Sequence, residues 1–115
     1  MSRDDAYLLD MLIAARRAAQ FASGISENEF RNSLLHQDAI IRRLEIVGEA
    51  AGRVSDVGRV QHANIEWRKI TGMRHRLAHD YRNVDLDIVW AVVTTEIPVL
   101  IRYLERVVPP EGSEP

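Results

Sequence analysis

A chain of 115 residues, 46% hydrophobic and 28% charged, has the length and composition of a single globular domain. It contains no cysteine, which excludes a disulfide framework, a cysteine-ligated zinc site and a thiol nucleophile. The formal net charge of −2 gives no indication of a nucleic acid partner. The first residues are charged where a signal peptide would turn apolar, and no apolar run approaches the ~20 residues of a membrane span. We therefore expect a cytoplasmic protein without a membrane segment.

The first two helices are predicted from apolar spacing and from capping signals. Residues 4–22 have apolar positions three and four apart, and Gly24 follows as a helix-terminating glycine. Ser26 and Glu29 have the spacing of a capping box. The second helix begins either directly after Ser26 or, following an irregular turn, near Ser33. Its predicted core residues are Ile40, Leu44, Val47, Ala51 and Val54.

Two further patterns characterise this second helix. Small residues gather near its end and would let a neighbouring helix approach closely: Gly48, Ala50, Ala51 and Gly52. A polar series follows the core series along the helix: Asp38, Arg42, Glu45, Glu49 and Arg53. After it, residues 55–63 have no hydrophobic period and contain a glycine, which predicts a connector.

The third helix is predicted to begin with Asn64 as N-cap and to extend through Leu77. Residues 80–83 have the composition of a turn. A fourth helix begins at Asp85, and Pro98 inside it predicts a kink near residues 93–94. Its apolar stripe is Leu86, Trp90, Val93, Ile97, Leu100 and Leu104.

These elements predict an all-α fold, an antiparallel bundle of four main helices with one possible short extra helix. The domain spans residues 1–108, and residues 109–115 form a polar tail that we expect to be disordered. The fourth helix carries surplus apolar residues at Val89, Val92 and Val99, although a ~100° stripe suffices for a surface helix. These surplus residues could form a second interface in a homodimer. Burial of the same residues by two neighbouring helices of one chain is an equally favoured alternative.

Side chains able to bind phosphate or move protons are densest in residues 71–81. This stretch holds Arg74, His75, His79 and Tyr81. The surrounding residues 68–82 carry a local charge of +4, because this range contains five basic residues and one acidic residue. They are Arg68, Lys69, Arg74, Arg76 and Arg82, against Asp80.

On an unbroken third helix, Arg74 would share the apolar face with Ile70 and Leu77. A guanidinium there needs a carboxylate partner or a phosphate ligand. Glu45 and Glu49 of the second helix are the candidate partners. Arg74 therefore has two interpretations at this stage, a structural ion pair at the rim of the core and a phosphate-binding group.

Arg74 and His79 would lie ~140° apart on an ideal helix. They can meet only if the helix unwinds near Ala78 or if two copies of the motif meet across a dimer. His75 and His79 share a face at a spacing that suits a metal pair. Asp80 is the single adjacent carboxylate, however, so we expect no metal site.

Arginine, histidine and tyrosine without a metal cage suit the cleavage of RNA. The 2′-hydroxyl supplies the nucleophile, histidine moves protons near neutral pH, and the planar guanidinium stabilises charge on phosphate. This chemistry requires no cofactor. The other basic residues would bind RNA phosphates: Arg68, Lys69, Arg76 and Arg82.

The motif Arg74-x4-His79-x-Tyr81 resembles that of HEPN-domain proteins, and more narrowly that of the HepT toxin family. Members of this family pair with a minimal nucleotidyltransferase antitoxin, MntA. Three further stretches, residues 37–50, 65–74 and 84–90, resemble the family's second-helix signature, its entry to the site and its last helix. The resemblance covers roughly residues 5–106.

The resemblance implies a HEPN-type homodimer whose motifs line a cleft between protomers, with metal-independent endoribonuclease activity. Arg74 and His79 would be the catalytic pair, supported by the polar residues His75 and Asp80. An MntA-like antitoxin would silence the toxin by transferring AMP from ATP to Tyr81, as in a type VII-like toxin–antitoxin system. RNA and this antitoxin are the expected partners.

Three positions depart from the family pattern. His75 stands where relatives often have Asn, Asp80 where they often have Gly, and Arg82 where an aromatic is common. Asp80 could favour the protonated form of His79 or repel RNA. Two alternatives to the ribonuclease remain, namely an inactive HEPN module that binds nucleotide or docks a nucleotidyltransferase, and a structural bundle in which Tyr81 is a packing residue.

Overall fold

The computed structural model describes residues 2–78 and 83–109. These residues form helices and no strand, which confirms the predicted all-α fold. The tail predicted for 109–115 lies outside the described residues from position 110 onward. In chain order the elements are α1 (Arg3–Ala22), α2 (Glu27–Arg31), α3 (Leu34–Ala51), α4 (Asp56–Gln61), α5 (Trp67–Thr71), α6 (Met73–Leu77), α7 (Leu86–Ala91), the π-helical turn η1 (Val92–Glu96) and α8 (Ile97–Val107).

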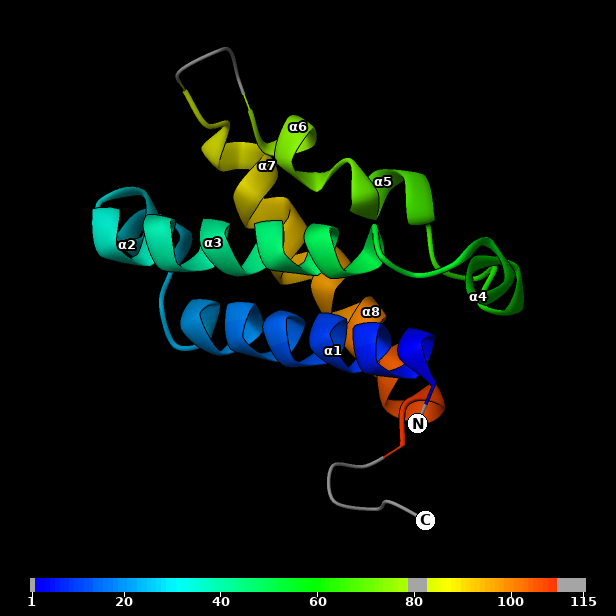
Figure 1. Cartoon of the computed structure of the whole chain (residues 1–115). Coiled ribbons are helices and arrows are strands. Elements are labelled where there is room, and N and C mark those ends of the chain that lie inside the picture. Colours follow the sequence, from blue (N-terminus) through cyan, green and yellow to red (C-terminus); the bar gives the residue numbers. More distant parts are fainter. Residues whose placement is uncertain (1, 79–82, 110–115) are drawn as a thin grey trace.

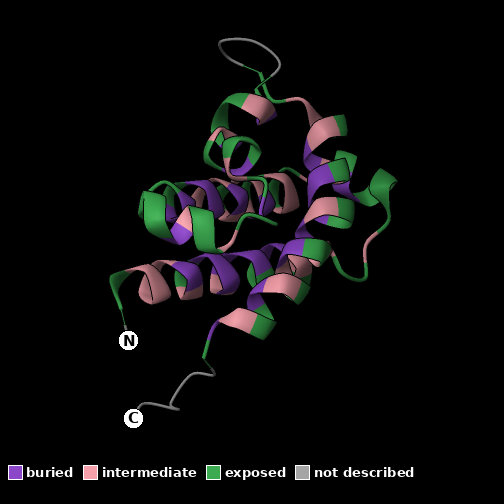
Figure 2. Ribbon diagram, turned by 90° about the vertical axis from the view of Figure 1, so that its right-hand side faces the viewer, coloured by how far each residue is buried: buried purple, intermediate pink, exposed green. Residues whose placement is uncertain are grey.

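The bundle is built on α1 and α3, which lie antiparallel and side by side (Figure 1). Helices α5 and α6 pack on α3, while α7, η1 and α8 cross behind the pair, so that α8 contacts α1. The buried residues follow the facing sides of these helices (Figure 2). All five predicted core residues of the second helix are buried: Ile40, Leu44, Val47, Ala51 and Val54. No helix among the described residues has both the length and the apolar content of a membrane span.

Side-chain caps set the boundaries of the first three helices. The predicted capping box is present, because the Glu29 amide donates to Ser26 and the Ser26 amide donates to Glu29. Ser33 caps α3 in turn, so both predicted starts are real and delimit two helices, α2 and α3. Gly24 ends α1 with φ +83°, a conformation that favours glycine.

The predicted connector over 55–63 was wrong in part, because it contains the short helix α4. Ser55 caps this helix by accepting a hydrogen bond from the Gly58 amide. Its own amide and hydroxyl donate to Asp4 of α1, at 2.9 and 2.5 Å. Val57 and Val60 are exposed, so α4 has no apolar period that sequence spacing would detect.

The predicted third helix was wrong at its start and in its continuity, whereas its predicted end at Leu77 is confirmed. Its N-cap is Glu66 rather than Asn64, and Gly72 divides it into α5 and α6. The Trp67 indole nitrogen donates to two backbone carbonyls of the α4 region, which fixes the start of α5 against the preceding turn. The predicted close approach to α3 is confirmed, since a Cβ added to Gly48 would lie 2.8 Å from the Ile70 carbonyl oxygen.

The last helical segment begins at Asp85, whose carboxylate accepts from the amides of Asp87 and Ile88 as predicted. The residues for which a kink was predicted, 93–94, lie within the π-helical turn η1, where the Ile97 amide donates to the carbonyl of Val92. Of the three surplus valines, Val89 and Val92 are fully buried within the chain, whereas Val99 is 57% exposed. Cover by the same chain therefore accounts for two of them.

Candidate functional site

Arg74 is exposed on α6, which corrects the prediction that it lies on the apolar face. The break at Gly72 restarts the helix, and Met73 and Leu77 take the buried positions of α6. The predicted carboxylate partners are engaged elsewhere, because Glu45 and Glu49 both pair with Arg42 at 3.8 and 3.2 Å.

The structural ion pair considered for Arg74 is therefore absent among the described residues, where no hydrogen bond or ion pair to its guanidinium is found. An exposed guanidinium without a carboxylate keeps its donors available to an incoming anion, and its planar fork matches phosphate. Of the two interpretations drawn from the sequence, this environment favours the phosphate-binding group.

Helix α6 ends immediately before the second half of the motif. Ala78 is extended, with φ −79° and ψ 131°, and forms an antiparallel bridge with Val84. The Asp85 amide donates to the Leu77 carbonyl at 2.8 Å, so the chain on either side of residues 79–82 is held together. The predicted alternative of unwinding near Ala78 is confirmed, and the 140° separation of an unbroken helix does not apply.

Four predicted site residues lie outside the described residues: His79, Asp80, Tyr81 and Arg82. The turn predicted over 80–83 falls there as well, apart from Asn83. Sequence order places these residues directly after the end of α6, between the bridged positions Ala78 and Val84.

The remaining predicted site residues differ in their surroundings. Arg68 and His75 are exposed. Lys69 forms an exposed ion pair with Glu66 at 3.2 Å. Arg76 is bound by Glu96, a residue that the sequence analysis did not select, through two hydrogen bonds of 3.1 and 2.7 Å. Glu96 lies twenty positions away in the last helical segment, so no local pattern indicates it.

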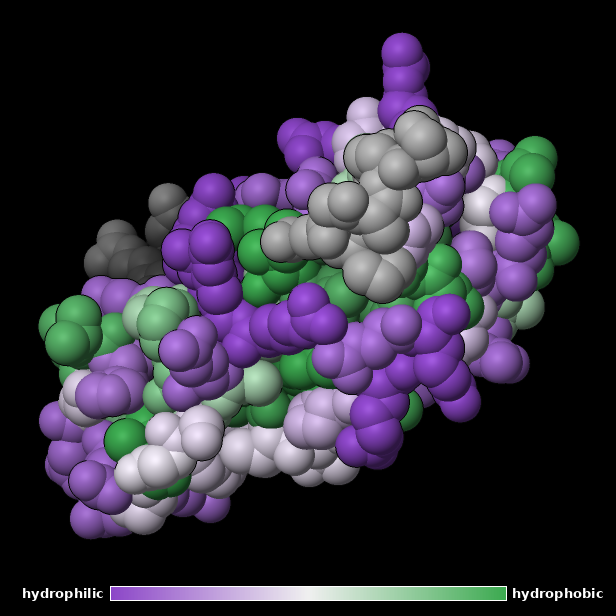
Figure 3. Space-filling view, turned by 90° about the horizontal axis from the view of Figure 1, so that it is seen from below, coloured by the Kyte–Doolittle hydropathy of each residue, from purple (hydrophilic) through white to green (hydrophobic). Residues whose placement is uncertain are grey.

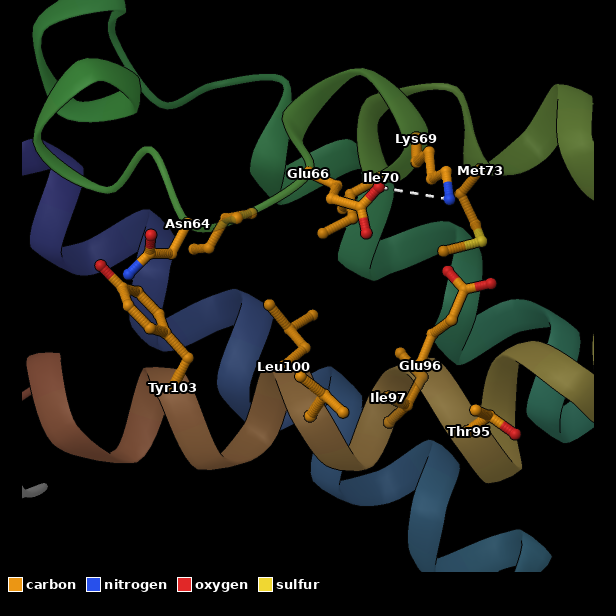
Figure 4. A pocket seen from close by; sticks show the side chains of 12 residues that line it. Asn64, Glu66, Lys69, Ile70, Met73, Thr95, Glu96, Ile97, Leu100 and Tyr103 are labelled. Carbon is orange, nitrogen blue, oxygen red and sulfur yellow. Dashed lines mark ion pairs between the residues drawn. The ribbon is translucent and has the colours of Figure 1, made fainter.

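A cavity of ≈ 220 Å³ lies between α5 and α6 on one side and η1 and α8 on the other (Figure 4). Ile70, Met73 and Leu100 contribute to its apolar walls, and the Glu66–Lys69 ion pair lies at its edge. Arg74 does not line it, so the cavity is separate from the exposed arginine. Within the described part of the chain, no three potential metal ligands gather at one place.

The bundle and the motif define the class of protein. An all-helical fold, with an exposed arginine followed along the chain by the motif histidine and tyrosine, is what the resemblance to HEPN domains implied. A family profile described as Ribonuclease HepT-like matches residues 11–107. The chain belongs to this HepT-like ribonuclease family.

Similar proteins occur in Methanocaldococcus jannaschii, Thermococcus cleftensis and Caldanaerobacter subterraneus. "Putative RNase MJ1380" of Methanocaldococcus jannaschii is 34% identical over 93% of this chain and 100% of its own length. "Probable ribonuclease HepT" of Thermococcus cleftensis is 34% identical over 87% of this chain and 91% of its own length. A relative from Caldanaerobacter subterraneus, "Putative RNase TTE0752", is 31% identical over 91% of this chain and 94% of its own. No solved structure is significantly similar to the chain.

Proposed function

We propose that this protein is a cytoplasmic, metal-independent endoribonuclease in which Arg74 and His79 act on the RNA phosphodiester. The observation that carries the proposal is the exposed Arg74, without a described carboxylate partner, on a helix that ends just before the motif histidine. Membership in the HepT-like ribonuclease family supports the reaction class.

The proposed reaction uses the nucleophile that RNA carries. His79 takes the proton of the 2′-hydroxyl as the oxygen attacks phosphorus, and the 5′-oxygen leaves with a proton returned from a histidine. Arg74 stabilises the charge that develops on the non-bridging phosphate oxygens. His75 and Asp80 would adjust the polarity around His79, and a second copy in a homodimer would supply a second motif to the cleft.

Exposed cations beside the motif would bind the RNA backbone. Arg68 and Lys69 on α5 precede Arg74 along the same surface segment, and Arg82 follows it in sequence. Each phosphate neutralised by such a residue makes binding weaker at higher salt. The RNA affinity of the protein should therefore fall steeply as the salt concentration rises.

The test is cleavage of a single-stranded RNA by the purified full chain with a chelator present. We expect cleavage, and we expect His79→Ala to reduce it by ~10²–10⁴-fold, the usual contribution of general acid–base catalysis. His36→Ala is the control, because the described hydrogen bonds of the His36 ring and amide to a side chain are to Ser33, at the start of α3. A strict requirement for Mg²⁺, or full activity in His79→Ala, would contradict the proposed mechanism. Absence of cleavage by the wild-type chain would favour the inactive HEPN module.

We propose further that the protein is the toxin of a toxin–antitoxin pair and that Tyr81 is its regulatory residue. An MntA-like nucleotidyltransferase would transfer AMP from ATP to the Tyr81 hydroxyl, with release of pyrophosphate. The attached nucleotide would add negative charge beside Arg74, where RNA phosphate would otherwise bind. Two features support this role, the motif tyrosine itself and the surrounding basic residues that would steer ATP phosphates toward it.

Co-expression with the partner enzyme tests the modification. Mass spectrometry should find an adenylyl group on the peptide that contains Tyr81, and Tyr81→Phe should keep its toxicity while resisting the partner. Tyr103→Phe is the matched control, since Tyr103 bonds to His62 at 2.8 Å, far along the chain from the motif. An unmodified Tyr81 in a silenced complex would show that binding alone inhibits the nuclease.

A further inference from the structure

Arg76 and Glu96 join α6 to the π-helical turn η1. The two guanidinium nitrogens Nη1 and Nη2 of Arg76 donate to the two carboxylate oxygens of Glu96, at 3.1 and 2.7 Å. Arg76 has 25% of its side chain exposed and Glu96 has 41%. Such a bidentate pair fixes direction as well as distance, because the planar fork fits the carboxylate in one orientation.

Helix α6 depends on this kind of external support. It has five residues, and no side chain caps its N-terminus. Isolated helices of this length are not stable in water, because nucleation is costly and few hydrogen bonds follow it. The orientation of α6 therefore rests on its buried residues Met73 and Leu77, on the Leu77–Asp85 backbone bond and on the pair with Glu96.

The position of Glu96 follows from the irregularity of the last helical segment. Pro98 has no amide hydrogen to donate to the Thr94 carbonyl, and its ring crowds that carbonyl in a regular α-helix. The backbone widens into the π-helical turn, where the Ile97 amide reaches back to Val92. Glu96 is the last residue of this turn and faces α6, as Figure 4 shows from the cavity side. Such π-helical insertions are frequent at functional sites.

We propose that Glu96 is a positioning residue of the ribonuclease, acting through Arg76 to hold α6 and thereby Arg74 in the orientation that catalysis requires. This inference rests on the proposed function. Arg76 then differs in role from the other basic residues of the motif region, because its fork is occupied by a carboxylate and is not available to RNA phosphate. Arg74, two residues earlier on the same short helix, has no such partner among the described residues.

Steady-state cleavage by four variants tests this role. The variants are Glu96→Gln, Arg76→Gln, their double combination, and the reversed pair Arg76→Glu with Glu96→Arg. We expect each single variant to lower kcat by about 10- to 100-fold with little change in KM, since small misplacements of a catalytic group have effects of this size. The double variant should be no worse than either single one, and the reversed pair should recover part of kcat.

The opposite assignment, Arg76 as a phosphate ligand, makes different predictions. Arg76→Gln would then raise KM, and Glu96→Gln would leave kcat intact or lower KM by freeing the guanidinium. That pattern would overturn the proposal. Glu105→Gln is the matched control, because Glu105 of α8 forms an inter-helix pair with Arg16 of α1 at 2.8 Å. An equal loss of kcat in Glu105→Gln would show that loss of any inter-helix ion pair lowers activity through general stability. That result would also overturn the proposal.

Hydrogen exchange separates this inference from the proposed function. The Asp85 amide, bonded to the Leu77 carbonyl at the end of α6, reports the order of that end whether or not RNA is cleaved. Glu96→Gln should accelerate its exchange and Glu105→Gln should not. If the wild-type protein has no nuclease activity but the two variants show this difference in exchange, the proposed function is wrong. The conclusion that the Arg76–Glu96 pair holds α6 in place would still stand. Unchanged exchange in Glu96→Gln would defeat the positioning role.

Discussion

The α1–α3 pair and the α5–α6 segment meet in one bundle but are built in opposite ways. Helices α1 and α3 have 20 and 18 residues, begin at side-chain caps and bury continuous apolar stripes. Helices α5 and α6 have five residues each, lack side-chain caps and carry exposed cations. The first pair supplies a rigid support. The second segment takes its position from that support and keeps charged groups available at the surface.

The pairing of surface charges also differs between α1 and α6. Figure 3 shows hydrophilic and hydrophobic side chains mixed over the face of the molecule seen from below. Arg16 and Glu105 form an ion pair across these two helices. On α6, by contrast, Arg74 has no described partner. If the comparison is correct, substitutions of exposed residues in the α5–α6 segment should lower activity without loss of stability. Substitutions in the core of the α1–α3 pair should lower stability without a selective loss of activity.

The largest expected effect is on activity in the α5–α6 segment. Arg74→Ala should lower the rate of RNA cleavage by ~10²–10³-fold, as does loss of one preorganised donor to a developing oxyanion. The thermal midpoint should not change, because Arg74 is exposed and has no described partner. Arg102→Ala, an exposed arginine of α8, is the control and should leave both quantities unchanged. A lowered thermal midpoint in Arg74→Ala would show that the arginine is structural.

The next effect is on stability in the α1–α3 pair. Leu44 is fully buried at the centre of α3. Leu44→Ala should lower the free energy of unfolding by ~2–5 kcal/mol, because it removes buried methyl groups and leaves a cavity. Urea unfolding measures the change, and cleavage per folded molecule should stay near the wild-type value. A selective loss of activity in the folded fraction would mean that the two regions are more tightly coupled than the comparison assumes.

The contact between the two regions is tested at Gly48. A Cβ there would meet the Ile70 carbonyl oxygen at 2.8 Å and the Met73 Cβ at 3.1 Å. Gly48→Ala should destabilise the protein by ~1–3 kcal/mol, the usual range for overpacking, and should shift α5 and α6 outward. Gly52→Ala is the control, because its nearest contacts are 3.4 and 3.5 Å away. Equal unfolding midpoints for the two variants would show that α3 does not approach α5 and α6 most closely at Gly48.

The smallest expected effect is on the pH dependence of stability, through Asp4 of α1. The hydroxyl and amide of Ser55 donate to Asp4 and hold the pKa of that carboxyl below its ordinary value of 3.8. A lowered folded-state pKa stabilises the protein above the unfolded-state pKa, and this contribution is lost as pH falls through the folded value. Asp4→Asn should therefore be less stable than wild type near neutral pH, with a difference that shrinks below about pH 4. Urea midpoints across this range measure it, with Asp10→Asn as the exposed control.

Local signals were sufficient for much of the fold. Ser26, Ser33 and Asp85 each cap the helix that the sequence predicted, because a capping side chain bonds to amides within three residues of itself. The core series of α3 followed from spacing alone. The motif from Arg74 to Tyr81 was equally visible, and it led to the family that the profile match then showed.

Contacts between distant residues decided the rest. Helix α4 begins at its N-cap Ser55, whose hydroxyl donates to Asp4 across 51 positions, and Arg76 pairs with Glu96 across 20. Val89 and Val92 are buried by the protein's own chain, and Arg74 is exposed because its helix restarts at Gly72. Sequence by itself determined the elements whose hydrogen bonds close within a few residues. Only the tertiary structure decided which side chains those elements bring together, because packing joins residues that no local period relates.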